Sequence, residues 1–185
     1  PSVCQFISDS VYEGRLSSHV DCVNQKLSVP ETAELITKET GIVFVGVEHD
    51  GNVQKSQEEV DRIKEVYAEL LGRSYTSADG RMRPLALSDF LFITPYNAQV
   101  RALQEALPPG ARIGSVDRFQ GQEAPVCILS LCSSCGEYGL SGLGFIPDQN
   151  RLNVAISRAQ CLAVVEGDPR IGATQASPLP ERNHV

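Results

Sequence analysis

Two polar segments, each beside an apolar run, carry the residue types that one side of a nucleotide site needs. Gln120-Gly121-Gln122-Glu123 precedes the apolar run 126–131, and the segment 151–159, which contains Arg158, precedes the apolar run 161–165. Gly121 allows a tight turn and a close approach of the main chain to a ligand. Glu123 could accept hydrogen bonds from a sugar hydroxyl, and Arg158 could stabilise charge on a terminal phosphate during phosphoryl transfer.

Each of these residues has a simpler interpretation when it is taken alone. Glu123 can be a solvated loop carboxylate. Arg158 has mostly apolar neighbours, so it can be a surface arginine whose stem packs on them or a buried cation that awaits an anion. Arg151 precedes Arg158 by seven residues, or two helical turns, which puts both on roughly one helix face. One of the two arginines can then be structural and the other catalytic.

Hydroxyl and amide side chains follow the apolar runs and suit contacts to a nucleic-acid backbone that do not depend on base sequence. They are Thr94, Asn97, Gln99 and Ser115. Tyr96 could stack on a base. The alternatives are structural: Thr94 or Asn97 can cap the helix that follows, and a tyrosine after a proline can simply pack in the core.

Two motifs that a self-sufficient nucleotide hydrolase requires are absent from the sequence. None of the 15 glycines is followed by lysine, so there is no Gly-Lys-Ser/Thr phosphate loop. No Asp-Glu pair is present to hold magnesium, and the three histidines show no spacing of a metal pair, so we interpret them as surface residues. The chain therefore resembles one wall of a nucleotide site that another domain closes, and any magnesium would be held by that other domain.

Composition indicates a soluble globular protein of 185 residues, with 42% hydrophobic and 21% charged residues. The net charge of −7 predicts poor non-specific binding to nucleic acid, so any strand must be held by a local patch or by neutral groups. No apolar run approaches the ~18 residues of a membrane span. Because the chain begins at Pro1, we expect it to be a piece of a longer protein.

The cysteines favour a reducing compartment. Cys127 and Cys161 lie inside apolar runs that suit central strands, which predicts buried, reduced thiols and an intracellular, cytoplasmic protein. Cys132-Ser-Ser-Cys135 is a lone CxxC pair, for which we favour a structural role at a strand end over a redox or metal role.

Apolar runs alternate with helical patterns about five times along the chain. We expect strands at 42–47, 90–94, 112–115, 126–131 and 161–165 and helices at 57–71, 97–107 and 150–159, with a surface loop at 73–88. Ser56-Gln57-Glu58-Glu59 fits a capping box, in which Glu59 reaches back to the Ser56 amide. The alternation predicts an α/β fold with a mostly parallel sheet of five to six strands and helices on both faces.

Three polar loops are expected to follow the carboxyl ends of strands, namely 94–99, 115–123 and the loop that leads to Arg151. Because ligands of open parallel sheets gather at the carboxyl ends of the strands, this placement predicts one shared site. We divide the chain into a peripheral N-terminal segment 1–40, which includes a short helix near 6–16, a central domain 41–170 and a loosely held tail 171–185.

At these residues the chain resembles the second RecA-like domain of superfamily 1 helicases, in the Upf1-like and Dna2-like branch. The segment 93–99 is similar to motif IV of that family, 115–123 to motif V, and 144–146 with 151–159 to motif VI. The segment 12–16 also resembles the interdomain link of bacterial members, some of which carry a RecB-like nuclease domain. The resemblance extends from about residue 5 to residue 170 and implies a single RecA-like domain.

The resemblance also implies roles. Glu123 would hold the ATP ribose, and Arg158 would be the arginine finger on the γ-phosphate, with Arg151 in the same nucleotide site. Gln120 and Gly121 would shape the nucleotide loop. Single-stranded DNA or RNA would contact the hydroxyl and amide side chains named above, with Thr94 and Ser115 on its backbone. The implied partners are the first RecA-like domain and, in some members, a fused nuclease.

The chain departs from the family pattern at three positions. Gln160 stands where a basic residue often follows the arginine finger, and Glu166 and Asp168 are acids at positions that are usually neutral. Both acids lie beyond Arg158, and we expect them to face solvent.

There are two alternatives to a motor domain. One is a module that keeps the helicase sheet but has lost motor function, and the other is a stand-alone sugar-nucleotide binder.

Overall fold

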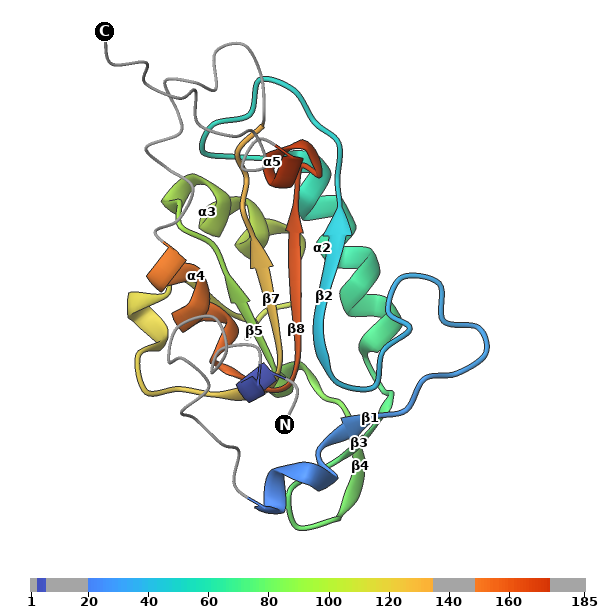
Figure 1. Cartoon of the computed structure of the whole chain (residues 1–185). Helices are drawn as coiled ribbons and strands as arrows, with labels where there is room; N and C mark the ends of the chain where they lie inside the picture. Colours follow the sequence, from blue (N-terminus) through green and yellow to red (C-terminus); the bar gives the residue numbers. More distant parts are fainter. Residues whose placement is uncertain (1–2, 6–19, 135–148, 174–185) are drawn as a thin grey trace, which may run out of the picture.

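The computed structural model describes residues 3–5, 20–134 and 149–173, and Figure 1 shows their arrangement. The main element is a parallel sheet of five strands in the order β2-β8-β7-β5-β6, formed by β2 (Gly41–Gly46), β8 (Ala159–Gly167), β7 (Ala124–Ser130), β5 (Phe90–Ile93) and β6 (Arg112–Gly114). The predicted α/β class and five- to six-stranded, mostly parallel sheet are confirmed.

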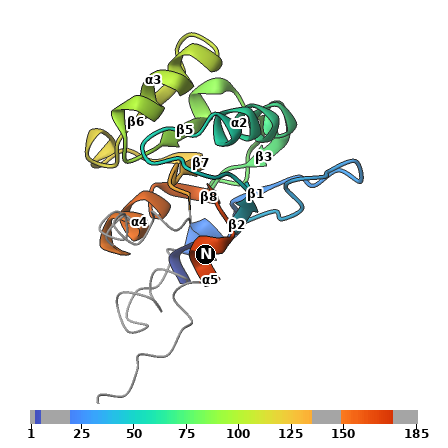
Figure 2. The ribbon, with the colours of Figure 1, turned by 90° about the horizontal axis from the view of Figure 1, so that it is seen from above.

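Helices cover both faces of this sheet. Figure 2 shows α2 (Gln57–Leu70) and α3 (Asn97–Ala106) on one face and α4 (Gln149–Ile156) on the other, on the side where α5 (Arg170–Ala173) also lies. The central strands are buried along their whole length because a helix layer lies on each side. Their side chains alternate between two cores: Phe90 and Phe92 pack under α2 and α3, while Leu91 and Ile93 pack in the core that contains Ala155 of α4.

The segment 73–88, expected to be a surface loop, instead contains two short strands. β3 (Ser74–Thr76) and β4 (Met82–Pro84) form an antiparallel sheet with β1 (Lys26–Leu27), which follows the short helix η1 (Val20–Asn24). Tyr75 of β3 is buried and its ring lies under the Arg83 guanidinium. Only β1 comes from a distant part of the chain; β3 and β4 form a hairpin whose strands of three residues are too short to give an alternating apolar pattern.

Part of the N-terminal segment joins the main core. Leu27 and Ile36 are fully buried in the cluster that contains Phe90 and Phe92. Glu69 of α2 holds this segment, because its carboxylate accepts hydrogen bonds from the amides of Leu35 and Ile36 at 3.0 Å each. The short helix expected near 6–16 and most of the tail 171–185 lie outside the described residues.

Helix α2 begins at the predicted cap, but only half of the capping box forms. The Ser56 hydroxyl accepts a hydrogen bond from the Glu59 amide at 3.1 Å, as predicted. The Glu59 carboxylate does not reach back to the Ser56 amide, which donates to Gln99 Oε1 at 3.0 Å. Glu59 is fully buried and its carboxylate accepts from His49 Nε2 and the Cys132 amide, which lie beyond the end of the sheet. Packing of α2 on the sheet therefore redirects this side chain from its own helix to tertiary partners.

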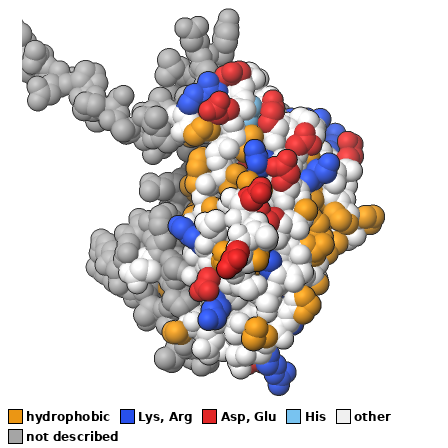
Figure 3. Space-filling view, turned by 90° about the vertical axis from the view of Figure 1, so that its right-hand side faces the viewer, with side chains coloured by type: hydrophobic (Ala, Val, Ile, Leu, Met, Phe, Trp, Pro, Cys, Tyr) orange, Lys and Arg blue, Asp and Glu red, His pale blue; other side chains and the backbone are white. Residues whose placement is uncertain are grey.

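The outward face of α2 carries charged side chains of both signs. Figure 3 shows acidic and basic side chains interspersed on it rather than gathered by sign. Arg62 and Glu65, one turn apart on α2, form one such ion pair at 2.9 Å. Exposed pairs of this kind contribute little to stability.

Glu166 and Asp168 do not face solvent as expected, since both are fully buried. Asp168 pairs with Arg170 at 2.6 Å. Glu166, on β8 between Val45 and Ser130 of the neighbouring strands, has no hydrogen-bond partner for either carboxylate oxygen among the described residues. Burial, together with the nearby charge of Glu59, raises the pKa of Glu166 to about 9, although Arg62 opposes the shift.

We predict that Glu166→Gln removes a pH dependence of stability. A carboxyl whose pKa is raised by folding stabilises the protein fully below its unfolded pKa and loses that contribution as the pH rises toward its folded pKa. The unfolding free energy of the wild type, relative to that of Glu166→Gln, should therefore fall by up to about 1.4 kcal/mol per pH unit between pH ~5 and ~9. Urea unfolding across this range measures the difference.

Glu105→Gln is the matched control, because Glu105 is an exposed carboxylate on α3. Its unfolding free energy should follow that of the wild type. Parallel curves for the wild type and Glu166→Gln would show that the buried carboxyl does not titrate in this range.

Candidate functional site

The candidate residues lie at opposite edges of the sheet. Glu123 and Arg158 immediately precede β7 and β8, so they lie at the amino ends of these strands, whereas Thr94 and Ser115 immediately follow β5 and β6 at the carboxyl ends. The three polar loops do meet at the carboxyl ends, as expected, but Glu123 and Arg158 lie at the other edge, so the candidate residues do not all share one site. The reason is that both connections are crossovers: residues 115–123, with the short helix η3 (Asp117–Phe119), and α4 each return the chain from the carboxyl edge to the amino edge.

At the amino edge, Glu123 and Arg158 are brought together by the pairing of β7 with β8. The Ala124 amide donates to the Arg158 carbonyl at 3.0 Å, which places the two candidate residues on adjacent strand starts. Arg158 is half-buried, and its Nε is buried without a hydrogen-bond partner among the residues that the structure describes. Glu123 is exposed. The edge thus presents a carboxylate and a guanidinium whose donor Nε is unsatisfied.

The departure at Gln160 bears directly on this edge. Its side-chain amide donates to Glu123 Oε2 at 3.4 Å, a long hydrogen bond. A basic residue at this position could form an ion pair with Glu123, whereas glutamine leaves the carboxylate charge uncompensated. Glu123 therefore remains a strong acceptor for a hydroxyl donor.

Gln120 and Gly121 form the turn that leads into β7. Both are exposed, and Gly121 has φ +75°, a left-handed conformation that glycine adopts without strain. A Cβ added to Gly121 would meet no atom within 4 Å, so the backbone conformation requires the glycine and crowding does not. The turn is thus an open main-chain surface beside Glu123, as the sequence predicts.

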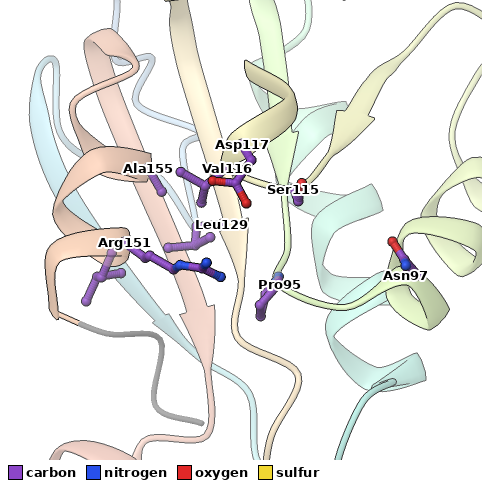
Figure 4. Close-up of a pocket in the computed structure, with 9 residues that line it drawn as sticks. Pro95, Asn97, Ser115, Val116, Asp117, Leu129, Arg151 and Ala155 are labelled. Carbon is purple, nitrogen blue, oxygen red and sulfur yellow. The ribbon is translucent and has the colours of Figure 1, made fainter. Parts of the chain in front are cut away.

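At the carboxyl edge the structure forms a pocket of about 240 Å³. Figure 4 shows that side chains from three connections line it, with Arg151 of α4 directed toward Pro95. The lining residues are Pro95, Asn97, Ser115, Val116, Asp117, Leu129, Arg151, Leu152 and Ala155. The pocket brings together Asn97 and Ser115, as expected. Arg151 also lines this pocket. It was expected at the nucleotide site, but it lies at the other end of α4 from Arg158.

Three of the predicted nucleic-acid contacts are buried side chains. Thr94 is fully buried with its hydroxyl 3.1 Å from Cys132 Sγ. Gln99 is also fully buried and bonds the main chain of Ser56 and the hydroxyl of Ser130. Tyr96 is 8% exposed, and its hydroxyl lies 3.3 Å from Ser133 Oγ. The structure corrects the expectation that these side chains contact a strand, because their polar groups bond other parts of the protein.

Sequence reasoning missed the buried network beneath this edge. His49, interpreted as a surface residue, is 4% exposed and lies between Glu59 and Ser134, at 2.8 Å and 2.6 Å. Burial by itself lowers the pKa of His49, but the hydrogen bond and the charge of Glu59 raise it overall. The one available signal was the strong helix start at Ser56, which places Glu59 in the first turn of α2 but does not show what it faces.

The expected burial of Cys127 and Cys161 is confirmed. Cys127, Cys132 and Cys161 are free, buried thiols, and burial raises the pKa of Cys132 and Cys161 to about 12. Cys135 lies outside the described residues. Among those residues there is no cluster of three or more metal-binding side chains, and none of the helices has the length and apolar character needed to cross a membrane.

Comparison with known proteins shows that the chain is similar to helicases. The family described as an AAA domain matches residues 1–170. Regulator of nonsense transcripts 1 homolog from Arabidopsis thaliana is 29% identical over 182 residues, which is 95% of this chain and 14% of that protein. DNA polymerase alpha-associated DNA helicase A from Saccharomyces cerevisiae is 29% identical over 185 residues, or 90% of this chain and 26% of that protein. ATP-dependent helicase upf1 from Schizosaccharomyces pombe is 38% identical over 85 residues, or 46% of this chain and 9% of that protein.

We predict that Gln99→Ala lowers stability. The substitution leaves the Ser56 amide without its acceptor and removes the hydrogen bonds of Gln99 to the Ser56 carbonyl and the Ser130 hydroxyl, so the unfolding free energy should fall by about 2 to 3 kcal/mol. Urea unfolding of the chain measures this loss. Asn97→Ala, two residues away and exposed at the start of α3, is the control and should change stability by no more than about 0.5 kcal/mol. Equal stability of the two variants would contradict the assignment of Gln99 to the core network.

Proposed function

The chain belongs to the AAA domain family as a RecA-like domain of the Upf1-like superfamily 1 helicases, and from that premise we propose that it is the second motor domain of such a helicase. It spans only 14% and 26% of two of the relatives named above. The proposed enzyme is therefore a larger ATP-dependent helicase, in which a first RecA-like domain holds the triphosphate and Mg²⁺. This chain supplies the opposite wall of that site at its amino edge.

The observation that carries the proposal is the unsatisfied Nε of Arg158 beside Glu123. A guanidinium with an unpaired buried donor suits an anionic ligand, and it has the planar geometry that phosphate oxygens match. A carboxylate would repel phosphate but accepts hydrogen bonds from sugar hydroxyls. Adjacent strands lie ~4.8 Å apart, so the two side chains can contact different parts of one nucleotide. Glu123 on the ribose and Arg158 on the γ-phosphate satisfy both groups.

Closure of the two domains would complete the chemistry. ATP would supply the transferable phosphoryl group, and Mg²⁺ held by the first domain would neutralise part of the charge of the triphosphate. As the cleft closes, Arg158 approaches the γ-phosphate, where its positive charge stabilises the charge that develops during transfer to water. The open turn at Gln120 and Gly121 lies beside the ribose contact. Opening after hydrolysis would change the grip of the carboxyl edge on single-stranded DNA or RNA, which is a gating step.

A second candidate is an interaction module that keeps the sheet without motor function. The contact between Gln160 and Glu123 favours it, because the carboxylate already has a partner within the chain. The net charge of −7 also favours it, because an acidic domain attracts polyanions poorly.

We predict that Arg158→Ala separates the two candidates. In the polypeptide that carries both motor domains, this change should lower kcat for ATP hydrolysis by roughly 10³-fold, because the arginine acts on charge that develops in the transition state. Thermal unfolding should remain close to that of the wild type. Arg81→Ala removes an equal charge from an arginine that is 87% exposed in the turn between β3 and β4, and it should retain activity. Full activity of Arg158→Ala would favour the interaction module.

We also predict that the 185-residue chain alone neither hydrolyses ATP nor binds it tightly. Its sequence has no phosphate loop, and an arginine and a ribose contact together provide only one wall of the site. Steady-state phosphate release and calorimetric titration with Mg²⁺–ATP test this, with the two-domain polypeptide as the positive control. Turnover by the purified chain would show that its own residues complete a site.

A further inference from the structure

Arg151 is a cation that lines the pocket at the carboxyl edge. It is exposed, and in the part of the chain that the structure describes it makes no hydrogen bond or ion pair. Its side chain extends from the first turn of α4 into the pocket toward Pro95 (Figure 4). Asp117 also lines the pocket but does not lie within ion-pair distance of Arg151. The guanidinium is therefore free to bind an external anion.

The geometry points to this pocket as the site of one backbone phosphate of the single strand, with Arg151 as its cationic anchor and Ser115 and Asn97 as neutral donors. The inference rests on the proposed function and names the residue that grips the strand. It moves Arg151 from the nucleotide, where the family resemblance places it, to the nucleic acid. A chain with a net charge of −7 needs such a local cation to hold a polyanion.

The position of Arg151 on its helix favours an anionic ligand. The amino end of an α-helix carries a partial positive charge, so a cation in the first turn is unfavourable unless an anion accompanies it. Arg151 lies in the first turn of α4, an eight-residue helix. A phosphate in the pocket would be attracted both by the guanidinium and by the helix end, and it would relieve the repulsion between the two.

A stacked base and a phosphate of ATP fit this pocket less well than a phosphate of the strand. A stacked base needs an aromatic platform, but none of the lining residues that the structure describes is aromatic, and the hydroxyl of nearby Tyr96 bonds Ser133. The proposed ATP site lies at the other edge, because Arg151 is in the first turn of α4 whereas Arg158 lies two residues beyond the last residue of that helix, next to the start of β8. A single helix thus connects the proposed phosphate contact to the proposed arginine finger.

The test measures strand binding by the two-domain polypeptide without nucleotide. Fluorescein-labelled oligo-dT and oligo-U report affinity by anisotropy across a range of salt concentrations. Arg151→Ala should weaken binding roughly tenfold on both strands, because a charge-assisted contact is lost. The slope of log Kd against log salt should become shallower by about 0.7, the value for one phosphate contact on a single strand. Arg151→Lys should recover part of the affinity, because it keeps the charge but not the planar fork.

Two further measurements locate the phosphate. On a strand with an uncharged methylphosphonate backbone, the wild type and Arg151→Ala should bind equally weakly. Asp117→Asn should bind the normal strand more tightly, because it removes a negative charge from the pocket that the phosphate enters. Arg81→Ala is the matched control for removal of an exposed arginine and should leave affinity and salt slope unchanged.

The outcomes separate this inference from the proposed function. If Arg151→Ala binds the strand like the wild type with the same salt slope, while Arg158→Ala loses hydrolysis, the phosphate pocket is wrong and the motor domain stands. If Arg151→Ala loses hydrolysis but not strand affinity, Arg151 belongs to the nucleotide site and the inference is overturned. If the wild type neither binds the strand nor hydrolyses ATP, the proposed function itself fails.

Discussion

The buried carboxylate of Glu59 is the interaction on which the carboxyl edge of the sheet depends. A buried charge is tolerated only where donors surround it, and here His49, the Ser130 hydroxyl and the Cys132 amide all donate to it. These partners belong to the loop after β2 and to the end of β7, so one side chain of α2 holds both segments. Gln99 extends the same network from α2 to α3. These hydrogen bonds hold α2, α3 and the end of β7 together at the edge where the pocket lies.

Because its strands are parallel, the sheet places the two groups of candidate residues at opposite edges. The amino ends of β7 and β8 carry Glu123 and Arg158, and the carboxyl ends of β5 and β6 lead into the pocket that Arg151 lines. In a parallel sheet every crossover must return from one edge to the other. Motif-bearing crossovers therefore place their first residues at one edge and their last residues at the other. In the proposed motor, this arrangement gives the nucleotide and the strand separate sites on one rigid body.

The electrostatics of the domain are local. The acidic net charge disfavours general attraction to nucleic acid, and the acidic and basic groups on the face of α2 are interspersed (Figure 3). The functional candidates are single cations in specific surroundings: Arg158 with an unsatisfied Nε, and Arg151 without a partner in the described residues. Glu166 differs from these arginines, because its raised pKa keeps the buried carboxyl protonated and uncharged at neutral pH.

The sequence alone determined the strands of the five-stranded sheet and the helices α2, α3 and α4, because continuous apolar runs such as 90–93 and the cap at Ser56 are local signals of burial and helix start. Motif order likewise indicated Glu123 and Arg158 as candidates. The tertiary structure decided which sheet edge each residue occupies and whether a polar side chain faces a ligand or the core. Thr94 and Gln99 look alike in sequence to Asn97 and Ser115, yet only the latter two line the pocket. The pattern of apolar residues predicts which residues are buried, because burial follows from the local sequence of an element. The hydrogen-bond partners of a polar group depend instead on chain topology: Glu59 and Ser130 are bonded although 71 residues separate them in the sequence.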